Sequence, residues 1–295
     1  MASVVAGVVS GSVCALVCSP LDVVRTRSQV FATLPPEVRA HFGDSHLLHT
    51  VRTVAKEEGW RGFFRGYSTS AIIVPAFWAT YFPCYEASKA YFAPEDGASV
   101  SRAGTAARHA ASAFVAAAIT DAVTNPLWVV RTRMQTQQLH ASQGWAPYKS
   151  TSHALRTIAR TEGVAALWKG FTASLFGTSH AVIQFPVYEA LKTRLSLRDP
   201  TADLGAGALI FASTASKLIA SAFTYPHEVV RARLQDQRSR LYRGAVHAFL
   251  TVYRTEGMTG LYAGFGIGLV RTLPACAVTF YVAERARQAY LNAVR

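Results

Sequence analysis

Long apolar stretches separated by short polar segments form the main pattern of this sequence. Several stretches run for about 20 residues without Asp, Glu, Lys or Arg. An α-helix of about 20 apolar residues crosses the roughly 30 Å hydrocarbon core of a membrane. The six candidate stretches are 1–21, 66–85, about 103–130, 170–188, about 204–230 and about 265–283. We therefore expect an all-α membrane protein with six transmembrane helices.

A segment built around a proline recurs three times. It reads SPLDVVRTRSQ at 19–29, NPLWVVRTRMQ at 125–135 and YPHEVVRARLQ at 225–235. Proline inside a helix is expected to kink it. Each copy is followed by a Glu-Gly pair and then by a Glu three residues before a Lys or Arg. The intervals of about 100 residues indicate an internal threefold repeat.

The expected repeats cover residues 1–97, 98–198 and 199–295, in one transmembrane bundle. Each repeat is expected to contain a kinked helix, a short surface helix and a second helix. The surface helices are expected at 45–57, 150–161 and 243–255, where apolar positions recur at helical spacing beside Arg and Lys. A soluble helical repeat protein is the alternative, and the length of the uncharged stretches disfavours it.

Composition and charge narrow the class further. Charged residues make up 16% of the chain. Soluble domains usually contain more, roughly 25%. The net charge of +13 fits basic loops beside anionic lipid head groups, and it also fits attraction of an anionic solute. Nucleic acid is not an expected partner, because the basic residues are scattered. No phosphate-binding loop, metal-ligand spacing or nucleophile–base pair is apparent, so neither a metal site nor catalysis is expected.

The charged residues of the proline motifs are expected to form a ring. In the first copy Asp22 and Arg25 share a helix face, with Gln29 one turn further along. Around a threefold axis, each acid can meet the base of the next repeat and close one end of a central cavity. The alternative for any single copy is a charge that reaches the membrane surface. The middle copy departs from the pattern, because Trp128 replaces the acid.

A second set of acid–base pairs lies at the far ends of the second helix of each repeat. The set comprises Glu86 and Lys89, Glu189 and Lys192, and Glu284 and Arg287. A ring at each end of a bundle predicts two gates used alternately. Each exposed pair contributes only about 0–1 kcal/mol, so such gates can open in every cycle.

Over its whole length the sequence resembles the mitochondrial carrier family. The resemblance rests on the threefold P-x-[D/E]-x-x-[K/R]-x-[K/R] motif and on the later [D/E]-G-x4-[aromatic]-[K/R]-G motif. It implies a monomeric, pseudo-threefold bundle with alternating access, surface helices on the matrix side and cardiolipin as a lipid partner. It also implies a matrix gate in which Asp22 pairs with Arg131, Glu228 pairs with Arg25 and Trp128 faces Arg231. The implied braces of this gate are Gln29, Gln135 and Gln235. Ala263 stands where the other repeats carry Arg65 and Lys169, which puts one cardiolipin contact in doubt.

Trp128 narrows the subgroup, because NPLWVVRTR is similar to carriers of folate, FAD, NAD and pyrimidine nucleotides. Other stretches resemble the folate and FAD carriers most, and YPHEVVR also resembles NAD carriers. The expected function is transport of an anionic nucleotide-like cofactor, FAD or folate first, across the mitochondrial inner membrane, with the peroxisomal membrane as the minority location. The alternatives are an NAD or pyrimidine nucleotide exchanger and a passive anion or proton channel. These cofactors are expected as transported substrates, with none bound as a prosthetic group.

The family resemblance implies substrate contacts about 13 residues before each acid of the far ring. The expected substrate-binding residues are Ile73, Val74, Trp78, Phe176, Gly177, His180, Gln184, Lys217 and Arg271. Arg271 either binds a phosphate or carboxylate or pairs with Asp121 or Glu284. Trp78 or Phe77 either stacks on a flat ring or packs between helices.

Two further positions in these spans have open interpretations. Gly177 either leaves room for a ligand or lets helices pack closely. Lys217 either attracts the anion or neutralises Asp121.

Overall fold

The computed structural model describes residues 2–34, 46–93, 102–198, 206–236 and 241–272, together with 274, 275 and 278. Regular structure in this part of the chain is helical, as expected, and contains no strand. The helices are α1 (Ala2–Val30), α3 (His46–Thr53), α4 (Tyr67–Tyr91), α5 (Arg102–Thr136), α6 (Thr151–Thr161), α7 (Phe171–Gly177), α8 (Ser179–Arg198), α9 (Ala206–Asp236) and α10 (Ala245–Leu261). Residues 265–272 are also helical.

The order of the helices repeats along the chain. A long helix with an internal proline (α1, α5, α9) precedes a surface helix (α3, α6, α10), and a second long segment follows. In the second repeat this segment is divided at Thr178 into α7 and α8. The three helices that carry the proline motif, α1, α5 and α9, contact one another pairwise, while α4 packs between α1 and α5, and α7 packs between α5 and α9. The sequence repeat is therefore also a spatial one.

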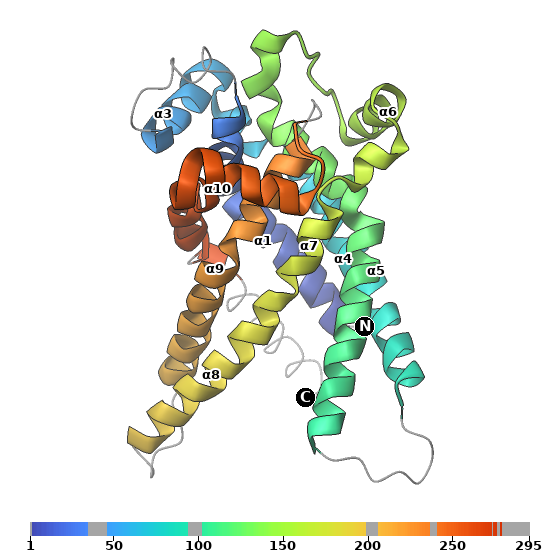
Figure 1. The fold of residues 1–295 in the computed structure, drawn as a ribbon, viewed down its shortest axis with the longest axis vertical. Coiled ribbons are helices and arrows are strands. Elements are labelled where there is room, and N and C mark those ends of the chain that lie inside the picture. The colour runs from blue at the N-terminus through green and yellow to red at the C-terminus, as the bar shows by residue number, and fades with distance from the viewer. Residues whose placement is uncertain are drawn as a thin grey trace, which may run out of the picture.

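The described long helices converge at one end of the bundle and diverge towards the other (Figure 1). The surface helices α3, α6 and α10 lie in the upper part of the view, where the long helices converge. Below them, α5 on the right runs away from the pair of α8 and α9 on the left. The described helices therefore diverge with distance from the surface helices.

Two described segments satisfy by themselves the length and apolar composition needed to cross a membrane. They are Arg108–Ala141 and Gly207–Asp236. The fourth expected span is interrupted, because α7 is only seven residues long and α8 carries four charged residues in its last ten. The assignment of this span therefore depends on the repeat pattern more than on its own composition.

Paired valines inside the proline motifs anchor the surface helices. These valines lie between the acid position and the arginine of each motif and are almost fully buried: Val23, Val24, Val129, Val130, Val229 and Val230. In the second repeat, Ala154 and Ile158 of α6 pack against the valine pair. Burying a side chain of this size stabilises the fold by about 1.5–3 kcal/mol. The apolar centre of each motif therefore fixes the level at which its charged residues lie.

Candidate functional site

The charged residues of the proline motifs meet where α1, α5 and α9 converge. Arg131 donates from Nη2 to Oδ2 of Asp22 at 2.7 Å, which joins α5 to α1. Arg25 and Glu228 form an ion pair that joins α1 to α9. These are the partners that the family resemblance implies, and the role of the contacts as a gate stays a prediction. The set Asp22, Arg25, Trp128, Arg131, Glu228 and Arg231 is called the proline-motif ring below.

Trp128 occupies the ring position at which the other two repeats place an acid. The guanidinium carbon of Arg231 lies 4.9 Å from the centre of the Trp128 ring, and that of Arg131 lies 5.3 Å away. Each such cation–π contact contributes about 0.5–2 kcal/mol. Arg231 therefore contacts Trp128, its expected neighbour, but this contact does not neutralise its positive charge as a carboxylate would.

Arg271 pairs with Asp22, an acid far from it in the sequence. Its Nε forms an ion pair with Oδ1 of Asp22, so the expected pairing with Asp121 is wrong. The other candidate partner, Glu284, lies outside the described residues. Asp22 belongs to the first repeat and reaches Arg271 only because the fold brings α1 beside the helical residues 265–272. Substrate binding by Arg271 stays a prediction.

The three motif glutamines contact hydroxyl groups of a neighbouring repeat. The hydrogen-bonded pairs are Thr26–Gln135 (2.8 Å), Thr132–Gln235 (2.8 Å) and Gln29–Tyr225 (3.1 Å). The third pair differs from the others because Ala232 stands where they have a threonine, and a tyrosine hydroxyl replaces it. The glutamines thus link the repeats next to the ring through hydroxyl groups.

The second arginine of each motif, to which the sequence pattern assigned no role, links the repeats in a cycle. Each Nε donates to the backbone carbonyl of the motif glutamine in the next repeat: Arg27 to Gln135 (2.9 Å), Arg133 to Gln235 (3.0 Å) and Arg233 to Gln29 (2.9 Å). These arginines are buried. The backbone of every repeat is therefore tied to the next one.

The same arginines pair with the Glu of the Glu-Gly motif in their own repeat. The ion pairs are Arg27–Glu58, Arg133–Glu162 and Arg233–Glu256. These partners were missed from sequence, although the repeated Glu-Gly and the second base of the proline motif were both visible. Together the contacts hold each surface segment against its own proline-containing helix.

A second cation reinforces this glutamate in two repeats. Lys169 contacts Glu162 at 3.0 Å, and Arg65 contacts Glu58, whereas Ala263 supplies no charge to Glu256. Burial alone would raise the pKa of Glu162, but hydrogen bonds and charge from Arg133 and Lys169 offset this and hold the pKa below its usual value. In this structure Arg65 and Lys169, which the resemblance links to cardiolipin, therefore pair with glutamates of their own repeats.

Three glycines allow close approach of neighbouring repeats. Gly66, Gly170 and Gly264 have φ angles of +80°, +83° and +78°. A Cβ on Gly170 would lie 2.9 Å from Cγ of Gln235 and 3.2 Å from the carbonyl oxygen of Arg231. The [K/R]-G motif therefore serves both a left-handed backbone and a contact with the next repeat.

The proline-motif ring encloses a cavity of about 240 Å³. Among the described residues that line it are four arginines but only two acids. The arginines are those of the ring together with Arg271. The cavity is therefore electropositive, as an anion-binding site requires.

The substrate-binding residues predicted on α4 are Ile73, Val74 and Trp78, and they pack against other side chains. Ile73 is 3% exposed in this conformation, and its contact with a ligand stays a prediction. Val74 packs close to Gly11 of α1. Trp78 stacks on the exposed Phe82 with 5.3 Å between ring centres. Packing between side chains is thus the present environment of all three residues.

A neighbouring face of α4 carries a run of stacked rings. Phe77 stacks on Tyr81 (5.8 Å between centres, 7° between planes), and Tyr81 stacks on Tyr85 (6.0 Å, 11°). Residues spaced by four share a helix face. Ser70 lies on the same face, where its hydroxyl accepts a hydrogen bond from Nε of Arg131 at 2.7 Å. One face of α4 thus connects an aromatic ladder with the proline-motif ring.

The residues proposed on α7 and α8 lie against α9. A Cβ on Gly177 would be 2.8 Å from Nε2 of His227, so this glycine serves helix packing. Nδ1 of His180 hydrogen-bonds with the Thr224 hydroxyl at 3.1 Å, and Gln184 interacts with the same histidine. The contacts with His227 and Thr224 place this predicted site at the interface of α7 and α8 with α9.

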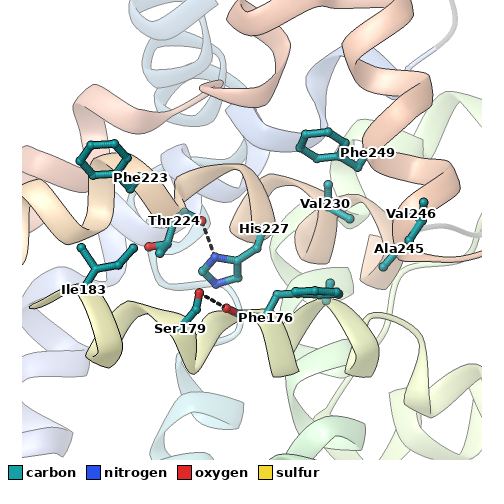
Figure 2. Close-up of a pocket in the computed structure, with 11 residues that line it drawn as sticks. Phe176, Ser179, Ile183, Phe223, Thr224, His227, Val230, Ala245, Val246 and Phe249 are labelled. Atoms are coloured by element: carbon teal, nitrogen blue, oxygen red, sulfur yellow. Dashed lines mark hydrogen bonds between the residues drawn. The ribbon is translucent and has the colours of Figure 1, made fainter.

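Phe176 lines a different pocket from the proline-motif ring. Figure 2 shows this pocket of about 340 Å³, with Phe176, Phe223 and Phe249 at its edges and His227 between them. It shares no lining residue with the ring cavity. Phe176 is 61% exposed. Its expected contact with a substrate in the central cavity is therefore not supported by its position.

Two sets of expected ion pairs are not formed among the described residues: Lys217 with Asp121, and the far-ring acids with the far-ring bases. Lys217 is exposed, and no ion pair connects it to Asp121 within the described chain. Neutralisation of Asp121 by Lys217 is therefore wrong for this structure. The described far-ring residues, Glu86, Lys89, Glu189 and Lys192, likewise form no ion pair with one another. Arg287 lies outside the described residues, as does its neighbour Glu284.

These features define an all-α membrane transporter built from three related repeats around an electropositive cavity. The profile of the family described as "mitochondrial carrier protein" matches residues 1–96, 102–199 and 202–293. The chain therefore belongs to the mitochondrial carrier family. As members of this family transport solutes, it is a transporter rather than an enzyme, and it works without a bound cofactor.

Three similar proteins come from Arabidopsis thaliana. "Nicotinamide adenine dinucleotide transporter 2, mitochondrial" is 38% identical over 95% of this chain and 77% of the relative. "Nicotinamide adenine dinucleotide transporter 1, chloroplastic" is 40% identical over 93% of this chain and 87% of the relative. "Folate transporter 1, chloroplastic" is 36% identical over 95% of this chain and 92% of the relative.

Proposed function

We propose that this carrier moves an anionic, nucleotide-like cofactor across the mitochondrial inner membrane by alternating access. The observation that carries this proposal is the surplus of arginine over acid in the proline-motif cavity. Guanidinium groups bind phosphate and carboxylate oxygens through paired hydrogen bonds. The names of the similar proteins agree, since they include NAD and folate transporters.

The conformation supports alternating access. At the end with the surface helices, Asp22 and Glu228 hold the repeats together through ion pairs. At the other end, the described far-ring residues remain apart and the helices diverge (Figure 1). We infer from these contacts a carrier whose matrix gate is closed and whose opposite gate is open. Rearrangement would engage the far ring as the proline-motif ring separates.

The aromatic ladder of α4 supports a cargo with a flat ring. Bases stack on aromatic side chains with about 1–3 kcal/mol for each base. Tyr81 and Phe77 lie on the helix face that meets Arg131 through Ser70. An adenine or nicotinamide ring on this face would leave the phosphates free to reach the arginines. We therefore place dinucleotides, NAD together with FAD, before folate as candidate substrates.

Transport by purified protein in liposomes tests this proposal. Labelled NAD, FAD, folate and pyrimidine nucleotides are supplied outside, with the same compound or none inside. We expect uptake of at least one cofactor, and we expect internal substrate to accelerate this uptake. Liposomes that contain no protein should take up none of the compounds. Failure of every cofactor and nucleotide to move overturns the proposal. A passive channel predicts instead chloride or proton flux that needs no cofactor on either side.

A further inference from the structure

Arg231 is a partly buried cation without a hydrogen-bonded partner among the described residues. Its Nε and Nη2 are both buried and have no acceptor atom, although the residue lines the ring cavity and retains some exposed surface. The corresponding arginines of the other repeats, Arg25 and Arg131, each have a carboxylate. Leaving charged donors buried and unpaired costs stability, so a missing acceptor is implied.

Two groups beside Arg231 are unpaired donors too. Nε1 of Trp128 and Nε2 of Gln235 are buried, line the same cavity and lack partners within the described chain. Four N–H-bearing atoms of three residues that line the cavity thus lack an acceptor among the described residues. A set made only of donors, two of them on a guanidinium, fits an oxyanion.

The nearest acid does not supply the missing charge. Asp121 of α5 influences Arg231 electrostatically, but no ion pair joins them. Asp22 is already shared by Arg131 and Arg271, and Glu228 is paired with Arg25. Within the described ranges, no carboxylate is therefore left to pair with the positive charge of Arg231.

We propose that a phosphate of the transported cofactor binds Arg231 and takes the role of the carboxylate that pairs with the corresponding arginine of each other repeat. The inference rests on the proposed function and adds a subsite to it. Nε and Nη2 of Arg231 donate to the phosphate oxygens, and the Trp128 indole and Gln235 amide supply further donors. The cargo thus completes the ring in its third repeat, and a diphosphate is preferred over a phosphate-free ring compound.

The size of the cavity agrees with a phosphate subsite. The cavity measures about 240 Å³. Pockets that enclose a whole drug-sized ligand are larger, with a lower limit of roughly 300 Å³. A dinucleotide would therefore place only its diphosphate between the arginines. Its rings would extend along the bundle, in the direction of the Phe77–Tyr81–Tyr85 ladder.

Trp128→Asp and Trp128→Asn provide a matched test, since they remove the same indole and differ by one charge. Binding of inorganic pyrophosphate and of NAD is measured on the purified full-length protein by calorimetric titration, with adenosine as the phosphate-free probe. The aspartate supplies Arg231 with a permanent counter-charge. We expect it to weaken binding of both phosphorylated probes about 10- to 100-fold relative to the asparagine variant. Adenosine binding should be the same in both variants.

Arg231→Gln gives a second route to the same answer. It should lower the affinity for pyrophosphate by a similar factor, whereas Arg254→Gln, on an exposed position of α10, should leave it unchanged. Apparent melting temperatures identify a variant that has merely lost its fold. Trp128→Asp should be at least as stable as Trp128→Asn, because its new carboxylate faces a buried arginine.

The outcomes separate this inference from the function on which it rests. If the wild type transports a cofactor but Trp128→Asp and Arg231→Gln bind pyrophosphate and NAD as tightly as their controls, the phosphate subsite is wrong and the transport proposal stands. If the wild-type protein moves no cofactor in liposomes, both proposals fail. Selective loss of the phosphorylated probes in the two variants, together with wild-type transport, supports both.

Discussion

The carboxylate of Asp22 forms an ion pair with Arg271, a residue from the opposite end of the chain. The same carboxylate accepts a hydrogen bond from Arg131 at 2.7 Å. One acid of the first repeat therefore holds arginines of both other repeats, and Asp22 is itself only 6% exposed. Removing one partner of a buried ion pair typically costs about 3–5 kcal/mol.

Asp22→Asn should accordingly destabilise the closed end of the bundle by roughly 3–5 kcal/mol, since two guanidinium groups lose their counter-charge. Thermal unfolding of the purified protein in detergent should show a lower apparent Tm. Glu57→Gln is the control, because Glu57 is exposed and forms no ion pair within the described residues. Equal Tm values for the two variants would show that Asp22 does not hold the repeats together.

Glu162→Gln should destabilise the second repeat at pH 7 by about 3 kcal/mol, because Arg133 is fully buried and depends on this carboxylate. The pKa of Glu162 is lowered in the folded protein. Its contribution to stability is therefore complete above the unfolded pKa of about 4.3 and is lost as the pH falls through the lower folded value. The difference in stability between wild type and variant should shrink below about pH 4. A difference that stays constant from pH 7 to pH 3 contradicts this account.

Gly170→Ala should lower the apparent Tm more than Gly163→Ala does. Both glycines have positive φ, so both substitutions introduce strain of order ~1–3 kcal/mol. Only at Gly170 does a Cβ also collide with the next repeat, whereas nothing lies within 4 Å at Gly163. Parallel melting curves of the two variants measure the contribution of the inter-repeat contact. Equal losses would mean that backbone strain alone explains both.

Gly177→Ala should impair both stability and transport, because its Cβ would meet the His227 ring and push α7 away from α9. Gly207→Ala is the matched change, since Gly207 is also helical and has no neighbour within 4 Å. Alanine is favoured over glycine in a helix by up to about 1 kcal/mol, so the control should be neutral or slightly stabilising. Liposome uptake and melting temperature of both variants provide the measurement. A Gly177→Ala protein with wild-type values would exclude tight packing at this interface.

Local pattern was sufficient to predict the fold and much of the proline-motif ring. The triplicated motif predicted repeated helices, and the family resemblance added the partners of Asp22 and Glu228. The spacing of residues on one helix was insufficient for Arg271, because its partner lies on a helix from another repeat. The same limit hid the glutamates that pair with Arg27, Arg133 and Arg233, which become neighbours only when the surface segment folds back.

The substrate-contact positions were harder to predict, since counting residues along a helix gives depth but not direction. Ile73 is buried, and Phe176 lines a separate pocket. The division of the fourth span at Thr178 also alters which side chains share a face beyond Phe176. The orientation of each helix about its own axis depends on packing against its neighbours, which no single-helix pattern contains.

The hydrogen bonds from Arg27, Arg133 and Arg233 to the next repeat form a closed cycle with no free end. When two of these links are made, the third pair of groups meets as parts of one molecule, at an effective concentration far above that of separate partners. A single broken link therefore re-forms before the helices move apart. This end of the carrier is thus expected to switch in an all-or-none manner, with few half-open states.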